Sequence, residues 1–155
     1  MRRLVPLLVA GLVLVTTMSL QAQDSPQTIY VYRYKEGGGF LNVKFPIYLD
    51  DREVARIENG RFFVIRVKPG DHILRSNDKQ SGIQLSAQQT FIRIEPCNHC
   101  PGWKVAGRVS LEGPEQAVVE LKKLKYSDAK DIKDNNLVLL SAPPTLTSDP
   151  QNQRP

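Results

Sequence analysis

Two cysteines and a histidine stand almost side by side in this chain, at Cys97-Asn98-His99-Cys100. Both cysteines of the protein belong to this segment. In an oxidising compartment, two cysteines this close most simply form a local disulfide. Closing so short a loop stabilises a fold by roughly 2 kcal/mol on the chain-entropy model. We therefore predict a structural disulfide between Cys97 and Cys100.

The same segment has two further interpretations, which stay open. His99 directly precedes the second cysteine, as in thioredoxin-like oxidants, where an imidazolium and a helix N-terminus lower the thiol pKa. Here Pro101-Gly102 leads into a predicted strand, so that helix is not expected. The two cysteines and His99 also offer three donors to a metal, whereas a structural zinc site needs four. A thiol-redox or metal-handling role for Cys97 and Cys100 is the alternative to a structural bridge.

A stripe of tyrosines is the candidate binding face. Tyr30, Tyr32 and Tyr34 alternate along a segment rich in β-branched and aromatic residues, so their rings face the same way in a strand. Such a stripe can stack against the rings of a glycan. It can equally form one wall of a core, or a sheet face that the C-terminal helix covers.

The other polar residues do not assemble a catalytic set. His72 follows a Pro-Gly turn and is predicted to be structural. Gly37-Gly38-Gly39 is not a phosphate loop, because no Lys-Ser/Thr pair follows it. Asp50-Asp51 lacks the spaced ligands of a calcium loop. We predict that the protein is not an enzyme and that it binds no cofactor and no metal.

Strand patterns dominate from Thr28 to Leu111, and turn residues punctuate them. Asn59-Gly60 is a hairpin signal, since both residues tolerate positive φ, and Pro69-Gly70 marks another turn. The last pattern alternates most clearly, with Trp103, Val105, Gly107, Val109 and Leu111 on one face. One dry and one wet face are typical of an antiparallel sheet. We predict an all-β antiparallel sandwich of about seven strands.

The period changes after Gly113. Pro114 suits a first helical position, and the apolar residues that follow recur at helical spacing, which predicts a C-terminal helix over about 114–126. Its lysines would lie in the last turns, where the helix dipole favours positive charge. The segment 128–136 is predicted to be loose, and 137–140 to add an edge strand or dock as an extended piece. The proline-rich segment 141–155 is predicted to be a disordered tail.

The N-terminus indicates the compartment. Arg2 and Arg3 precede an apolar run, and a more polar stretch then ends at Ala22, which is the layout of a secretory signal peptide over 1–22. A retained anchor is the alternative, although a spanning helix needs about 20 apolar residues. The domain then covers 23–140. Since the first cysteine is Cys97, a lipid anchor is not expected, and contact with the membrane is limited to the signal peptide.

Charge argues against a nucleic-acid partner. The net charge of +5 is mild, two of the arginines lie in the leader, and basic residues alternate with acidic ones. We therefore expect no nucleic acid among the partners.

Four motifs resemble a bacterial family of secreted proteins and lipoproteins, the domain of unknown function 2846 family. They are Tyr30-Val-Tyr-Arg33, Ile47-Tyr-Leu-Asp50, Asn59-Gly-Arg-Phe-Phe63 and Lys68-Pro-Gly-Asp-His72. The resemblance covers about 28–125 and implies a sandwich similar to PEGA-type and transthyretin-like modules, which bind or brace. Two features depart from the family: Asp51 replaces the usual turn glycine, and the lipobox cysteine is absent.

These observations together predict a non-catalytic binding or scaffolding module, secreted or periplasmic, with an envelope protein or a glycan as its partner. The alternative is a periplasmic thiol-redox or metal-handling protein that acts through Cys97 and Cys100.

Overall fold

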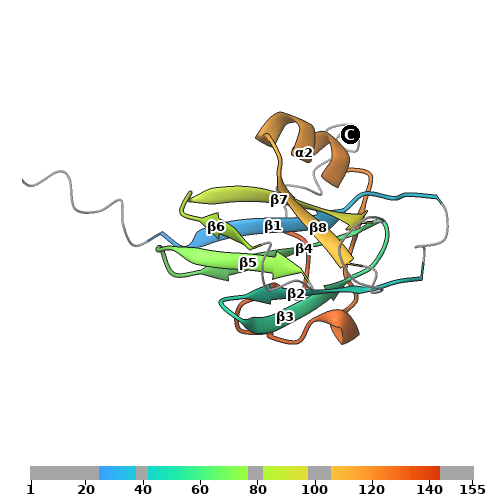
Figure 1. Ribbon diagram of the computed structural model, residues 1–155. Coiled ribbons are helices and arrows are strands. Elements are labelled where there is room, and N and C mark those ends of the chain that lie inside the picture. Colours follow the sequence, from blue (N-terminus) through green and yellow to red (C-terminus); the bar gives the residue numbers. More distant parts are fainter. Residues whose placement is uncertain (1–24, 38–41, 77–81, 98–105, 144–155) are drawn as a thin grey trace, which may run out of the picture.

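The computed structural model describes residues 25–37, 42–76, 82–97 and 106–143, with two stacked sheets and one helix lying over one of them (Figure 1). The predicted signal peptide, Gly38, Gly39 and the chain after residue 143 lie outside the described residues. The all-β sandwich with one C-terminal helix is confirmed. No helix within the described part of the chain is long and apolar enough to cross a membrane.

The first sheet has the strand order β8-β7-β1-β4-β9. Its strands are β1 (Gln27–Arg33), β4 (Arg61–Val67), β7 (Gln89–Cys97), β8 (Ala106–Leu111) and β9 (Lys125–Tyr126). β1 runs antiparallel to β4 but parallel to β7, and β9 runs parallel to β4. The first sheet is therefore mixed rather than purely antiparallel. Its central strand β1 has an antiparallel neighbour, β4, on one side and a parallel neighbour, β7, on the other.

The second sheet is antiparallel and has the order β3-β2-β5-β6. Its strands are β2 (Phe45–Leu49), β3 (Arg52–Ile57), β5 (His72–Ser76) and β6 (Ile83–Leu85). The described residues thus contain nine strands where the sequence predicts about seven, and the short β9 lies where the sequence predicts the end of the helix. Between β2 and β3, Asp50 and Asp51 both have positive φ, so the turn keeps the left-handed geometry that a glycine would favour.

Alternation along β1 divides the interior into two layers. Ile29 and Val31 are fully buried between the sheets, in a large cluster that also contains Phe45, Phe63 and Ile65. The intervening side chains point to the other face of the first sheet, beneath helix α2 (Pro114–Leu121). One strand therefore supplies both the inter-sheet core and the floor of the helix.

Helix α2 ends earlier than the sequence predicts. It stops at Leu121, and Lys122 serves as its C-cap. Lys125 lies instead in β9, where it pairs with Arg61 of β4. The backbone N–H of Lys125 donates to the carbonyl oxygen of Gly60. The last helical turn carries no basic residue, so the predicted role of the lysines on the helix dipole is wrong. Pairing with the edge of β4 replaces the further helical turns.

The segment after β9 is ordered, which corrects the prediction of a loose connection over 128–136. It contains the 3₁₀ helix η1 (Ala129–Asp131) and buries Asp131, Ile132 and Asp134. The prediction that 137–140 docks in extended form is confirmed, since Val138 bridges to Ile65. The start of the predicted tail also packs on the domain, where Pro143 is buried.

Candidate functional site

Cys97 lies at the end of β7, opposite Ala106, and its side chain is buried. Cys100 and His99 lie outside the described residues, so the Cys97–Cys100 disulfide and the metal set that includes His99 stay predictions. The described cysteine belongs to a strand rather than to the start of a helix. A strand end lacks the helix dipole that lowers the pKa of a reactive thiol.

Two of the three tyrosines are covered, so they do not form an exposed binding face. Tyr32 is fully buried and Tyr30 nearly so, because Ala117 and Leu121 of α2 pack over them. The ring of Tyr30 stacks on Phe91 with a centroid separation of 5.0 Å. This arrangement matches the alternative interpretation, a sheet face covered by the helix.

The polar ends of these tyrosines differ in environment. Burial raises the pKa of Tyr32, and the neighbouring carboxylate of Glu120 raises it further. Tyr34 is half-buried, and the guanidinium of Arg93 lies 5.8 Å from its ring centroid. Neither position offers an open aromatic platform of the kind that stacks on a sugar ring.

His72 braces the β2–β3 turn. Its Nδ1 lies 2.7 Å from Oδ2 of Asp50, and its Nε2 lies 2.9 Å from the carbonyl oxygen of Lys68. Two acceptors favour an imidazolium that donates from both nitrogens. Burial lowers the pKa of His72, but the bonds to Asp50 and Lys68 outweigh it and leave the pKa raised. His72 therefore acts as a turn clamp, as the sequence predicts.

Three carboxylates converge near η1. Oxygens of Glu58, Asp128 and Asp131 lie within 4.8 Å of one another. Three cations already serve them: Nζ of Lys44 lies 2.5 Å from Glu58 and 2.6 Å from Asp131, while Arg61 lies 3.3 Å and Lys130 3.7 Å from Asp128. Such charge balance is typical of an ion-pair network, which here ties η1 to the strands beside it.

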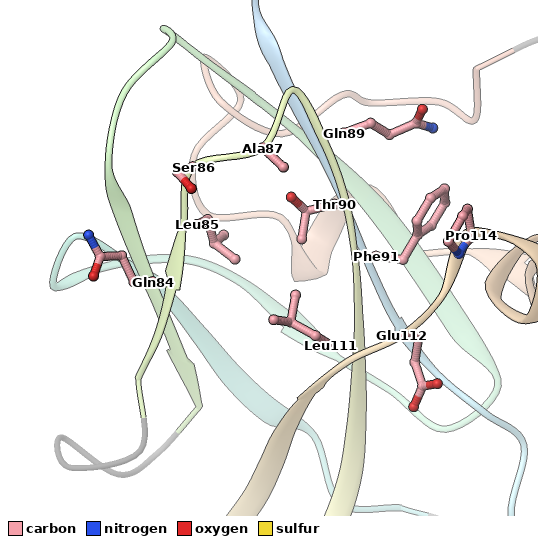
Figure 2. A pocket seen from close by; sticks show the side chains of 10 residues that line it. All are labelled: Gln84, Leu85, Ser86, Ala87, Gln89, Thr90, Phe91, Leu111, Glu112 and Pro114. Atoms are coloured by element: carbon pink, nitrogen blue, oxygen red, sulfur yellow. The ribbon is translucent and has the colours of Figure 1, made fainter.

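An open hollow of about 390 Å³ lies where the edges of the two sheets separate (Figure 2). It extends from the β6–β7 connection to the start of α2. The lining residues are Gln84, Leu85, Ser86, Ala87, Gln89, Thr90, Phe91, Leu111, Glu112 and Pro114. Figure 2 shows Leu85, Thr90 and Leu111 around its centre, one from each of β6, β7 and β8.

The second sheet covers the two ends of β8 unequally. At one end of β8, Gly107 is buried against β5, and an added Cβ would lie only 2.6 Å from Oγ of Ser76. At the other end, Leu111 pairs with the buried Ile92 and so faces the inter-sheet layer. Yet Leu111 is 57% exposed, because the three-residue β6 does not cover it. The side chain of Leu111, which faces the core, is thus left exposed beside the hollow.

The interior side of the hollow carries polar groups without partners. Thr90 is 7% exposed, and its Oγ1 has no hydrogen-bond partner among the described residues. Gln27, at the same end of the neighbouring β1, is 2% exposed, and both of its side-chain polar atoms lack partners in the described part of the chain. Buried polar groups are normally paired, so this end of the sandwich has unused hydrogen-bonding capacity.

Sequence reasoning missed this site. The alternation of Val109 and Leu111 predicts their common face, but it does not show that the opposing strand is too short to cover Leu111. Thr90 carries no signal of its own, because a threonine in a strand pattern is ordinary.

A scan against family models finds no match for this chain, and searches of curated proteins and of solved structures also find none. The resemblance to the domain of unknown function 2846 family stays a prediction.

Proposed function

We propose that this chain is an exported, non-catalytic binding module whose ligand occupies the hollow between β6, β7 and β8. The observation that carries the proposal is the hydroxyl group of Thr90, which is buried, unpartnered among the described residues, and part of the lining of an open hollow. Leaving such a group unpaired costs about 1–3 kcal/mol. Rotation of Thr90 about χ1 would turn Oγ1 into the hollow, where a ligand atom that pairs with it recovers part of that cost.

The lining defines the kind of group that fits. Leu85, Phe91 and Leu111 offer apolar surface, while the half-buried Glu112 adds a carboxylate. A volume of about 390 Å³ is at the small end of the range for ligand pockets. We infer a short apolar group that carries a hydrogen-bond donor, preferably a cationic one. The lysine side chain of an envelope protein has this chemistry.

The proposed setting is the periplasm or the extracellular space, and it rests on the N-terminal leader pattern. A structural Cys97–Cys100 disulfide belongs to the same proposal. The burial of Cys97 at a strand end supports that bridge over thiol exchange, since a reactive thiolate needs access and a pKa-lowering environment.

The site can be tested with small probes by NMR. The ¹H–¹⁵N spectrum of the protein is titrated with n-butylamine, n-butanol and butyrate in parallel. We expect the amides of 84–87, 89–91 and 111–112 to shift, most strongly with the amine and least with the carboxylate. Thr90→Val keeps the shape but removes the hydroxyl, so it should weaken the amine response.

A matched control lies on the neighbouring strand. Thr28→Val makes the same chemical change on the opposite face of β1, next to Gln89, and should leave the titration unchanged. Shifts centred elsewhere, or an amine response that Thr90→Val does not alter, would contradict the proposed site.

A further inference from the structure

The sheet edges of this domain are protected unequally. Open strand edges invite pairing with other chains, and proteins usually cover them. Here the C-terminal segment covers two edges. The N–H groups of Lys133 and Asp134 donate to the carbonyl oxygen of Val54 in β3, and that of Leu139 donates to Val64 in β4.

The remaining two edges are β6 and β8. β6 has three residues, whereas β8 has six and pairs only with β7 among the described residues. β8 is therefore the longest strand edge that the described part of the chain leaves open. It leads directly into the connection to α2 (Figure 1).

The pairing of β8 with β7 fixes which backbone groups are free. The N–H of Glu112 donates to the carbonyl oxygen of Phe91 at 3.0 Å, so residues 108 and 110, at the same phase, also direct their backbone toward β7. Hydrogen-bonded and non-hydrogen-bonded pairs alternate in an antiparallel ladder. Gly107, Val109 and Leu111 therefore direct their N–H and C=O groups away from the sheet, as the pairing of Gly107 with Pro96 also requires.

The side chains of β8 form a self-complementary pattern. Val109 and Leu111 lie on the inner face, while Arg108 and Glu112 lie on the outer face at either side of Ser110. Arg108 is exposed, Glu112 is half-buried, and neither forms an ion pair with another described residue. Reversing the strand direction about Ser110 exchanges the position of the arginine with that of the glutamate.

We propose that two copies of this chain associate through β8, antiparallel, with both Ser110 residues on the two-fold axis. In this register Val109 hydrogen-bonds with the partner's Leu111, and Arg108 lies opposite the partner's Glu112. The two first sheets then form one continuous sheet, and the partner's Val109 packs beside the exposed Leu111. A two-fold interface uses the same patch on both copies, which this pattern satisfies.

Charge favours this register over its neighbours. With Val109 on the two-fold axis, Arg108 faces the partner's Ser110 and the opposite-charge pairs are lost. With Arg108 on the axis it faces the partner's Arg108, and like charges directly opposite destabilise a strand pair. One six-residue edge buries less than the roughly 800 Å² per partner of a standard interface. We therefore expect a weak dimer that forms and dissociates with concentration in the micromolar range.

Sedimentation velocity over a range of protein concentrations tests the proposal. The wild-type protein should shift from monomer to dimer as concentration rises. Arg108→Glu should raise the dissociation constant about tenfold, because it replaces two opposite-charge pairs with two like-charge pairs. Arg108→Glu combined with Glu112→Arg restores opposite charges and should recover the wild-type constant.

A backbone variant tests the strand pairing itself. Val109→Pro removes an N–H that points away from β7, so it should abolish the dimer while the β7–β8 ladder is kept. Circular dichroism and thermal unfolding report whether the variant is folded. A wild-type protein that is monomeric at every concentration overturns the proposal. So does a dimer that neither Arg108→Glu nor folded Val109→Pro weakens. The dimer edge shares Leu111 and Glu112 with the lining of the hollow. Sedimentation without added ligand reports association alone, so its failure leaves the proposed ligand site standing.

Discussion

Gly107→Ala tests the close approach of β8 to β5 at the end of β8 that the second sheet covers. The added methyl carbon would lie 2.6 Å from Oγ of Ser76, 3.0 Å from Cγ2 of Ile94 and 3.3 Å from Cγ of Phe45. Overpacking a core by a methyl group costs about 1–3 kcal/mol. Alanine offsets roughly 0.5–1 kcal/mol of this by its smaller conformational entropy in the unfolded chain. We expect a net loss of about 1–2 kcal/mol in the free energy of unfolding.

The partner of the clash provides a double-mutant cycle. Ser76 is fully buried and its hydroxyl has no partner among the described residues, so Ser76→Ala alone should cost little. In the Ser76→Ala background, Gly107→Ala should cost about 1 kcal/mol less than in the wild type, since its closest contact is gone.

Urea unfolding followed by circular dichroism measures all four proteins. Gly37→Ala is the control, because an added Cβ at Gly37 meets nothing within 4 Å. It should change the free energy of unfolding by less than about 0.5 kcal/mol. If Gly107→Ala is as stable as the wild type, or if Ser76→Ala does not relieve its cost, the close approach of β8 to β5 is wrong.

Three further predictions concern the turn clamp, the C-terminal segment and the disulfide. The pKa of His72 is raised and that of Asp50 is lowered in the folded state. Their pair should therefore stabilise the fold fully between the unfolded pKa of Asp50 and that of His72, about pH 4 to 6.5, and the free energy of unfolding should fall on both sides of this window. His72→Gln should flatten this pH profile, which urea unfolding measures. Asp134 is buried, and its Oδ1 accepts a hydrogen bond from the backbone N–H of Asn136 at 3.0 Å. Asp134→Ala should therefore lower the free energy of unfolding by about 1–2 kcal/mol and speed amide exchange over 137–139. Unchanged exchange would show that the segment is held by other contacts. Replacing Cys97 and Cys100 by serine should lower the free energy of unfolding by roughly 2 kcal/mol and leave the butylamine titration unchanged. An unchanged stability would contradict the structural disulfide.

The sequence predicts the architecture because each strand pattern repeats over enough residues to identify a face. The alternation along β1 correctly separates Ile29 and Val31 from Tyr30 and Tyr32. The chain turns at Asn59-Gly60 as predicted, with positive φ at Gly60, but the predicted hairpin is wrong, because the turn leads from β3 in one sheet to β4 in the other. Local signals fail where two distant segments compete. The lysines after Leu121 have helical spacing, yet pairing of Lys125 with β4 ends the helix first.

The candidate site escapes sequence analysis for a related reason. Its lining comes from two short segments, 84–91 and 111–114, which are far apart in the chain and meet only in the folded domain. The exposure of Leu111 depends on the length of β6, and the isolation of the Thr90 hydroxyl depends on what lies across from it. Both are tertiary properties, whereas the chain itself draws attention to its cysteines and tyrosines.

The most direct test of the proposed binding function is a crystal structure of the protein grown or soaked with n-butylamine. We expect electron density for the amine in the hollow, with its nitrogen within hydrogen-bonding distance of Oγ1 of Thr90 or the carboxylate of Glu112, and its chain against Leu111. A hollow that is filled by the protein's own side chains, or that excludes the amine while the NMR shifts map elsewhere, would contradict it.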